Sequence, residues 1–263
     1  YVDAGASLID NAADVWHLVD MMVKVKEPLE CEYPLFHEGL ILYTYLHLAA
    51  DKEQTDALLA GKVKAVAYET IQEKDRSLPC LAPMSQIAGR LSIQEGAKYL
   101  EKKFGGEGIL LAGVPGTPKA NVVILGGGTV GMNACKIAVG MGANVTILDI
   151  NLKRLEELDN MFGAHIQTLV SSDSNIERVL KDADLVIGSV LIPGGSTPKL
   201  FKKKYLPEMR TVRYLWMWPS TRVAAANLPA LPLMMIRSLL KKALSTTVWA
   251  ICLVQCRGRA QLP

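Results

Sequence analysis

The sequence of 263 residues is long enough for one large domain or two ordinary ones with sizeable cores. Half of the residues are apolar and 21% are charged, the profile of a soluble globular protein. No apolar run reaches the ~18 residues that span a bilayer, and no secretory signal opens the chain. The five cysteines form neither a disulfide framework nor a zinc spacing. We therefore expect a reducing, cytoplasmic location and no metal. Because the chain begins with Tyr1 rather than Met, we also expect that the true N-terminus is missing.

The net charge of +3 is divided unevenly along the chain. Residues 211–263 carry seven basic residues and no acidic one, so residues 1–210 have a net charge of −4. The same tail holds three of the four Trp and only one of the 21 Gly. This shift in composition predicts a boundary near residue 210. A basic tail could contact nucleic acid or a membrane surface, but the genetic code offers another explanation, given below, and we expect neither partner.

Short apolar runs alternate with helical patterns over residues 1–81, which we interpret as a partial second α/β domain that binds substrate. The predicted strands are 20–26, 40–46 and 63–67, and the predicted helices are 11–18 and 51–60. A long helix then runs to about Lys103, with Ser85 as its N-cap and Pro83 two residues earlier. The Gly- and Pro-rich segment 105–119 is predicted to be a loop with a short strand at 109–111.

The most informative segment is a Gly-rich turn between a strand and a helix. An apolar strand, 122–125, leads into Gly126-x-Gly128-x-x-Gly131, which opens a helix through residue 141. In this arrangement Gly126 permits the tight turn, Gly128 lets the backbone approach a pyrophosphate, and Gly131 lets helix and strand pack closely. The helix N-terminus offers unpaired N–H groups to the phosphates. The pattern predicts a dinucleotide site.

An acidic residue completes this pattern. A second strand, 144–148, ends at Asp149, which lies 18 residues after Gly131. A carboxylate there accepts hydrogen bonds from the adenosine ribose and repels a 2′-phosphate, which favours NAD over NADP. A helix at 175–181 and a strand at 183–190 continue the fold. We therefore predict a Rossmann NAD-binding domain over residues 82–210, in which Val190 and Leu191 border the nicotinamide because ligands lie at the carboxyl ends of parallel strands.

Two residues in the first domain are candidates for chemistry. Lys26 lies at the end of one predicted strand and His47 follows the next. A lysine there could bind a substrate carboxylate, and a histidine could move a proton during hydride transfer. The alternatives are that Lys26 is a surface charge and that His47 is a structural histidine. Tyr68 and Glu69, after the third strand, are candidates for supporting this site.

Several segments together resemble bacterial alanine dehydrogenase. They are, beside the Gly126 turn, Lys24–Glu30 (KVKEPLE), Leu42–Ala50 (LYTYLHLAA), Ala67–Ile71 (AYETI), Leu81–Arg90 (LAPMSQIAGR), Gly108–Gly116 (GILLAGVPG) and Leu148–Asn151 (LDIN). The resemblance runs from residue 1 to Met209. It implies an NAD-dependent enzyme that reversibly deaminates L-alanine to pyruvate and ammonium, and that assembles as a homohexamer.

The resemblance also implies roles for individual residues. Lys26 corresponds to the lysine that binds substrate, and His47 to the acid/base histidine. The positions that line the cofactor correspond to Ser85, Thr129, Val130, Asp149, Arg154, Ser171, Val190 and Leu191. One alternative is the NAD(H)-binding subunit of proton-translocating transhydrogenase, which shares the fold and the KxKEP-like segment. Another is a non-catalytic NAD-binding module, which would leave Lys26 and His47 without a role.

This sequence departs from the family pattern at both ends. The family's substrate-binding arginine belongs to an N-terminal segment that this sequence lacks, and the catalytic aspartate expected after Met209 is absent. We therefore expect this polypeptide itself to be inactive or nearly so.

The missing aspartate reappears in a shifted reading frame. Trp216-Met-Trp218-Pro219 can be encoded only as TGG ATG TGG CCN, whose bases read Asp-Val-Ala in another frame. In that frame, Met234-Met-Ile236 gives Asp-Asp, and the codons of 251–257 with the adjoining bases on either side permit Asn-Met-Pro-Gly-Ala-Val-Pro-Arg. These runs follow the family pattern in order. We interpret residues 211–263 as an out-of-frame tail after a single-base slip near 210–213. The alternative is a real basic amphipathic segment at 236–254 that contacts a membrane or a partner.

Overall fold

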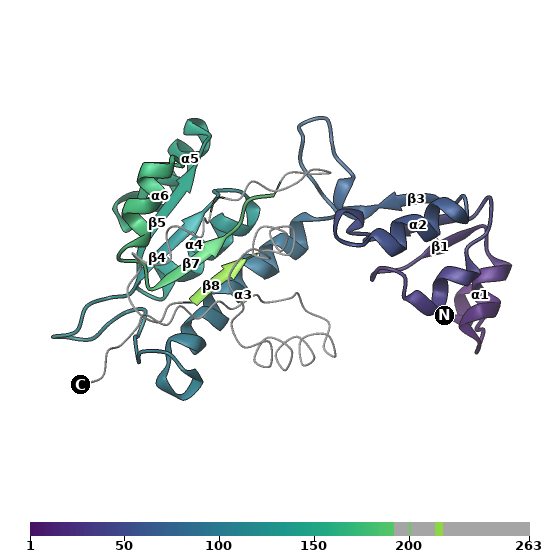
Figure 1. Ribbon diagram of the computed structural model, residues 1–263, viewed down its shortest axis with the longest axis horizontal. Helices are drawn as coiled ribbons and strands as arrows, with labels where there is room; N and C mark the ends of the chain where they lie inside the picture. The colour runs from purple at the N-terminus through teal and green to yellow at the C-terminus, as the bar shows by residue number, and fades with distance from the viewer. Residues whose placement is uncertain (192–199, 201–213, 218–263) are drawn as a thin grey trace. The chain divides into compact units, whose positions relative to one another are not determined.

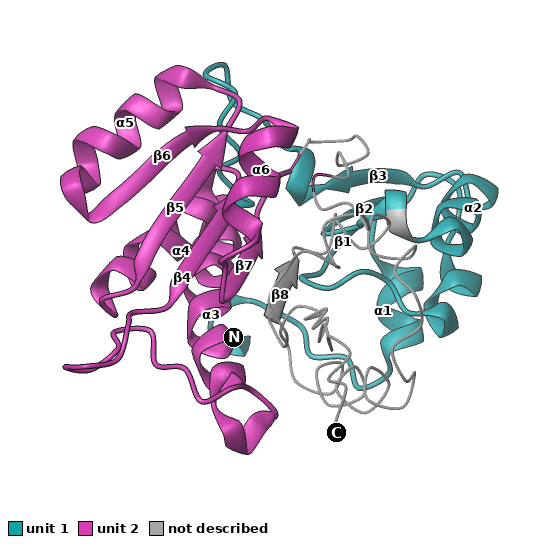
Figure 2. Cartoon of the chain, turned by 60° about the vertical axis from the view of Figure 1, so that its left-hand side comes forward, with its two compact units in different colours: residues 1–81, 193–195 teal, residues 82–192, 196–263 magenta. Residues whose placement is uncertain are grey.

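Two parallel β-sheets with flanking helices make up the described part of the chain (Figure 1). The computed structural model describes residues 1–191, 200 and 214–217. It divides the chain into two compact units, with residues 1–81 in unit 1 and the described residues from 82 onward in unit 2 (Figure 2). The α/β class predicted from the sequence is therefore confirmed. None of the helices in these ranges is long and apolar enough to cross a membrane.

Unit 1 is built on a three-stranded sheet in the order β1-β2-β3. Its elements are η1 (Val2–Ala4), α1 (Ala12–Leu18), β1 (Met21–Val23), η2 (Glu30–Leu35), β2 (Ile41–Thr44), η3 (Leu48–Ala50), α2 (Lys52–Ala60), β3 (Lys64–Ala67) and η4 (Tyr68–Thr70). The side chains of Asn11 and Asp51 cap the N-termini of α1 and α2. Trp16, Leu42 and Leu58 are buried in one apolar cluster, which joins both helices to the central strand.

The strands of unit 1 are shorter than the sequence predicts. Strand β1 ends at Val23, so Lys26 lies three residues beyond it rather than at its end. The Thr44 hydroxyl donates to the carbonyl oxygen of Lys26 at 2.9 Å, so this backbone carbonyl is hydrogen-bonded to a side chain rather than to a neighbouring strand. The Lys26 segment is therefore a loop anchored to the end of the central strand.

Unit 2 has a five-stranded sheet in the order β6-β5-β4-β7-β8. Its elements are α3 (Ala82–Leu100), η5 (Lys102–Phe104), β4 (Asn121–Leu125), α4 (Thr129–Gly140), β5 (Asn144–Asp149), α5 (Leu152–Phe162), η6 (Gly163–His165), β6 (Ile166–Val170), α6 (Asp173–Leu180), β7 (Leu185–Gly188) and β8 (Tyr214–Met217). All neighbouring strands are parallel. This is the strand–helix alternation of a Rossmann-like fold.

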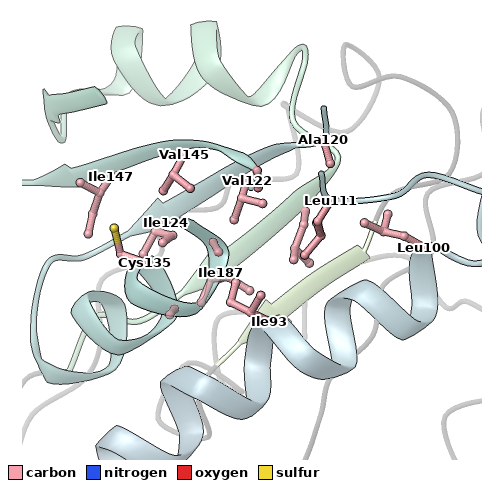
Figure 3. Packing of buried hydrophobic residues seen from close by; sticks show 14 of the residues in the cluster. Ile93, Leu100, Leu111, Ala120, Val122, Ile124, Cys135, Val145, Ile147 and Ile187 are labelled. Atoms are coloured by element: carbon pink, nitrogen blue, oxygen red, sulfur yellow. The ribbon is translucent and has the colours of Figure 1, made fainter. Parts of the chain in front are cut away.

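The core of unit 2 lies between the sheet and helices α3 and α4. Alternate residues of β4, β5 and β7, among them Ile124, Ile147 and Ile187, lie in one buried cluster with Ile93 of α3 and Cys135 of α4 (Figure 3). Alternation places them on one face of the sheet, because successive side chains of a strand point to opposite faces. Burial raises the pKa of the Cys135 thiol to about 12, so this cysteine is a neutral core residue at neutral pH.

Helix α3 begins and ends earlier than the sequence predicts. It starts at Ala82, so Ser85 is a buried residue within the helix and not its N-cap. Pro83 is tolerated because an N–H in the first helical turn has no intrahelical partner. The helix stops at Leu100, whose carbonyl oxygen accepts from the N–H groups of Gly108 and Ile109. The predicted strand at 109–111 is therefore wrong, because its backbone caps this helix instead.

Three further differences concern the second half of the sheet. Helix α5 and strand β6 were not predicted, and β7 is shorter than the predicted strand 183–190. Within the tail interpreted as out of frame, Tyr214–Met217 forms β8 beside β7. The amphipathic segment proposed at 236–254 lies outside the described residues.

Candidate functional site

The Gly-rich turn joins the central strand β4 to helix α4. Gly126 has a φ of 105°, and a Cβ there would lie 2.8 Å from Cγ2 of Val190. A Cβ on Gly131 would overlap the carbonyl oxygen of Gly126. Gly126 therefore has two reasons to be glycine, and Gly131 has a steric one.

The peptide groups of this turn are held by side chains. The Gly127 N–H donates to Oδ2 of Asp149 at 2.6 Å, and Nε of Arg154 donates to the Gly127 carbonyl oxygen at 2.7 Å. Arg154 also forms an ion pair with Glu157 at 2.7 Å. Asp149 and Arg154, both predicted to line a cofactor, thus lie at the Gly-rich turn and fix its shape.

The next part of the turn is open. Gly128 is exposed, and no atom lies within 4 Å of the position that a Cβ on it would take. It is the N-cap of α4, whose first N–H groups have no intrahelical acceptor. Thr129, the first residue of the helix, is also exposed. The open backbone at a helix N-terminus is suited to an anionic phosphate group.

A buried hydroxyl, that of Ser171, lies next to Asp149 just after the end of the neighbouring strand β6. The N–H of Ser171 donates to the backbone oxygen of Asp149 at 2.9 Å. The Oγ of Ser171 is buried and has no hydrogen-bond partner among the residues that the structure describes. Because buried polar atoms are almost always paired, this hydroxyl is suited to a hydrogen bond with a bound molecule. The open Gly128 backbone and the orphan Ser171 hydroxyl both fit a dinucleotide.

The remaining predicted cofactor residues divide into two groups. Val130 is buried against Ala88 of α3, with Leu191 packed on the same cluster. Ser85 is also buried and lies on α3, one turn before Ala88. Val190 packs against Gly126 instead. Val130 and Leu191 are thus brought together, whereas Val190 belongs to the Gly-rich turn.

Two lysines in the Lys26 loop differ in their surroundings. Lys24 forms an ion pair with Glu32 and lies over the Trp16 ring, 5.5 Å from its centroid. The Lys26 side chain is exposed and makes no ion pair within the described ranges. The ammonium group of Lys24 is therefore occupied by contacts within unit 1, whereas the ammonium group of Lys26 is available to a ligand.

His47 has an unusual backbone conformation. Its φ of 50° and ψ of 38° place it in the left-handed region, which a residue with a Cβ rarely adopts. Its N–H donates to Oε1 of Glu69 at 2.7 Å, and the N–H of Leu46 donates to the same carboxylate. On the other side, Nε2 of Gln54 donates to the Leu46 carbonyl oxygen at 2.6 Å. The Leu46–His47 peptide is thus held at both ends.

Two tyrosines complete the surroundings of His47. Tyr45 stacks on the His47 ring at a centroid distance of 6.3 Å and an angle of 13°, and its hydroxyl donates to the backbone oxygen of Cys80 at 2.5 Å. Tyr68 contacts the Tyr45 ring edge-on. Burial, together with the nearby Cys80 and Glu69, raises the pKa of Tyr45, so its hydroxyl remains a neutral donor. Tyr68 and Glu69 are the supporting residues that the sequence predicts, whereas no sequence signal marks Gln54 or Tyr45.

The fold and the turn define a class: unit 2 is a Rossmann-like nucleotide-binding unit, and unit 1 is a smaller parallel α/β unit with a constrained histidine. Comparison with known families makes the assignment specific. Residues 1–88 match the N-terminal domain of the alanine dehydrogenase/PNT family, and residues 92–212 match its C-terminal domain. The chain belongs to the alanine dehydrogenase/PNT family, as the motifs of the sequence predict.

Individual relatives sharpen this assignment. The chain is 56% identical over 210 residues to alanine dehydrogenase 2 of Staphylococcus aureus strain USA300. The aligned residues cover 80% of this chain and 56% of the relative. A solved L-alanine dehydrogenase superposes with a TM-score of 0.71 at 51% identity, over 80% of this chain and 58% of that one. The chain thus spans about half the length of the relatives that it matches.

A transhydrogenase shares the fold at lower identity. The structure from Sinorhizobium meliloti superposes with a TM-score of 0.62 at 22% identity, over 80% of this chain and 61% of that one. This likeness concerns the fold alone, so the transhydrogenase alternative is the less supported of the two.

Proposed function

We propose that this chain is part of an NAD-dependent alanine dehydrogenase. The observation that carries the proposal is the 56% identity to alanine dehydrogenase 2, set against 22% identity to the transhydrogenase structure. The overall reaction converts L-alanine, NAD⁺ and water to pyruvate, ammonium, NADH and a proton. NAD⁺, when bound, supplies the hydride acceptor. We further propose that the whole protein is a cytoplasmic homohexamer.

Unit 2 would hold the dinucleotide at the carboxyl ends of β4, β5 and β6. The N–H groups of Gly128, Thr129 and Val130 would face the pyrophosphate at the start of α4. Asp149 would accept hydrogen bonds from the adenosine ribose, and the orphan hydroxyl of Ser171 would gain a partner beside it. The remaining members of the proposed cofactor site are Ser85, Gly126, Gly131, Arg154, Val190 and Leu191.

Unit 1 would supply the groups that act on the amino acid. The exposed ammonium of Lys26 would bind the carboxylate or the carbonyl oxygen of the substrate. The His47 imidazole would take up and return protons as the imine and the carbinolamine form and break down. The hydrogen bonds from Leu46 and His47 to Glu69 support this role, because a general acid/base needs a fixed position.

The tail affects whether this polypeptide turns over alanine. The family match ends at residue 212, inside the interval where the shifted frame would begin. We propose that the family's aspartate is encoded in that shifted frame and is absent from residues 211–263 as given. Sequencing the DNA that encodes residues 205–263 tests this directly. A one-base discrepancy near codon 210 supports the slip, whereas an error-free read that still encodes the tail in frame refutes it.

The activity is tested by alanine-dependent reduction of NAD⁺, followed at 340 nm. The 263-residue chain should bind NADH and show no turnover, whereas the protein from the frame-restored gene should reduce NAD⁺ only when alanine is present. His47→Ala in the restored protein should abolish turnover and leave NADH binding intact. Unchanged activity in that variant would favour a non-catalytic role for His47. Hydride exchange between nucleotides without alanine would favour the transhydrogenase.

A further inference from the structure

Ser189 lies where strand β7 ends beside the Gly-rich turn. Its side chain is buried, and its Oγ is 2.9 Å from the carbonyl oxygen of Leu125 and 2.7 Å from that of Gly126. The backbone N–H of Ser189 also donates to Leu125, at 2.9 Å. A single hydroxyl proton is therefore shared between the last carbonyl of β4 and the first carbonyl of the turn.

The two carbonyl groups depend on this hydroxyl to different degrees. The Leu125 oxygen keeps the N–H of Ser189 as a donor whatever the side chain is. For the Gly126 oxygen, the Ser189 hydroxyl is the hydrogen-bond donor found among the described residues. Gly126 and Gly131 are both buried and packed on each other, so this oxygen is shielded from solvent. Without the hydroxyl, a buried carbonyl would be left without a donor.

The planarity of the peptide bond extends this effect to the neighbouring residues. The Gly126 carbonyl and the Gly127 N–H belong to one rigid peptide plane. Ser189 donates to its oxygen, and Oδ2 of Asp149 accepts from its N–H. Arg154 holds the carbonyl of the next plane, whose N–H belongs to Gly128. The Gly128 N–H therefore lies in a plane that Arg154 holds directly, and this plane continues at Gly127 from the one that Ser189 and Asp149 hold.

We propose that Ser189 is a positioning residue for dinucleotide binding, which it serves by holding the Gly126–Gly127 peptide against Asp149. This inference rests on the proposed function, because it assigns the turn to a dinucleotide. Ser189 itself touches no ligand in this account. It aims the Gly128 N–H and keeps the Asp149 carboxylate in place.

The test compares two buried hydroxyls of unit 2 in the full 263-residue chain. Ser189→Ala removes the donor to Gly126, whereas Ser92→Ala removes a buried hydroxyl that donates to Gly89 within α3 at 2.7 Å. Ser189→Cys keeps a side chain of similar shape with a weak donor and serves if the alanine variant does not fold. NADH affinity is measured by fluorescence titration, and exchange of the Gly127 amide hydrogen is measured by NMR.

We expect Ser189→Ala to raise the Kd for NADH about tenfold and to speed Gly127 exchange, with Ser189→Cys between it and the wild type. Ser92→Ala should change neither. Equal effects of Ser189→Ala and Ser92→Ala on both measurements, or none from Ser189→Ala, would overturn the proposal. If Gly127 exchange responds to Ser189→Ala alone but no form of the chain binds NADH, the positioning of the turn stands and the proposed function fails.

Discussion

The turns that follow the central strands β2 and β4 are each fixed by side-chain hydrogen bonds to both ends of one peptide plane, but the two turns use different residues. In each, one peptide plane has its carbonyl held by a neutral donor and its N–H held by a carboxylate. In unit 1 the donor is Gln54 and the acceptor is Glu69, while in unit 2 they are Ser189 and Asp149. Each turn also contains a residue with positive φ.

The residue with positive φ distinguishes the two turns. In unit 2 it is Gly126, for which φ of 105° carries no side-chain strain. In unit 1 it is His47 at 50°, which costs of order 1–3 kcal/mol and persists only where surrounding contacts fix it. The contacts of the glycine turn have no such strain to offset, whereas the contacts of Glu69 and Gln54 must offset the strain of the histidine turn. Lys62 and Arg76 also have positive φ, so the peptide held at both ends, and not φ alone, distinguishes His47.

The largest effect on stability and on NADH affinity is expected when a methyl group is added to the glycine turn by substitution. Gly131→Ala should destabilise unit 2 by about 3 kcal/mol and weaken NADH binding about a hundredfold, because the new Cβ would overlap the Gly126 oxygen. Gly140→Ala, in the same helix and with nothing within 4 Å, is the matched control and should be neutral or slightly stabilising. Urea unfolding and NADH titration measure both variants. Identical behaviour of the two would contradict the packing described for the turn.

The histidine turn should respond next most strongly. Glu69→Ala leaves the N–H groups of Leu46 and His47 without their acceptor and should lower the free energy of unfolding of unit 1 by about 2 kcal/mol. The amide hydrogen of His47 should exchange faster in the same variant. Glu73→Ala, an exposed glutamate four residues on, is the control and should change neither. Slow exchange at His47 in the Glu69 variant would show that this carboxylate does not hold the turn.

A smaller effect is expected from charge at the Asp149 position. Asp149→Asn keeps one oxygen that can accept from the Gly127 N–H, loses the second oxygen that accepts from the Asn151 N–H, and removes the negative charge that repels a 2′-phosphate. The preference for NADH over NADPH should fall about tenfold, and loss of the acceptor for the Asn151 N–H should lower the free energy of unfolding by about 1 kcal/mol. Competitive titrations with both nucleotides measure this ratio. An unchanged ratio would mean that Asp149 does not face the adenosine ribose.

The smallest expected effect is the contribution of Cys135 to the pH dependence of the free energy of unfolding, which is absent near neutral pH. Burial raises the pKa of its thiol from 9.0 to about 12. Between these two pH values the thiol stays protonated in the folded state and ionises in the unfolded state. Its contribution to stability is therefore complete below pH 9 and is lost as the pH rises towards 12. Urea unfolding from pH 8 to 11 should detect this loss, and Cys135→Ala should reduce the slope. The thiol should also resist iodoacetamide in the folded state while the exposed Cys31 reacts.

Local sequence patterns predicted much of unit 2 because the glycines of its turn recur at a fixed spacing. The strand, the Gly-rich turn and helix α4 are contiguous, and their glycines are required by backbone geometry. Helix α5 was missed although its signal was present: Asn151 caps its start, and Leu155 and Leu158 are buried three residues apart. Strand β6 is half-exposed at most positions, and this weak alternation gave little to recognise.

The contacts that shape the His47 turn could not be predicted in the same way. Glu69 lies 22 residues from His47, and Gln54 reaches Leu46 from a different helix. Glu69 was a candidate only because it follows a strand, and Gln54 has no distinguishing motif. The αL conformation of His47 depends on these tertiary contacts and not on its own side chain, so no local pattern encodes it.

The most direct test of NAD-specific dinucleotide binding by unit 2 is a titration of the full 263-residue chain with NADH and, separately, NADPH, followed by nucleotide fluorescence. We expect saturable binding of NADH, binding of NADPH at least about tenfold weaker, and NADH binding that is about a hundredfold weaker in Gly131→Ala but unchanged in Gly140→Ala. A folded chain that binds neither nucleotide, or that binds NADPH as tightly as NADH, would contradict it.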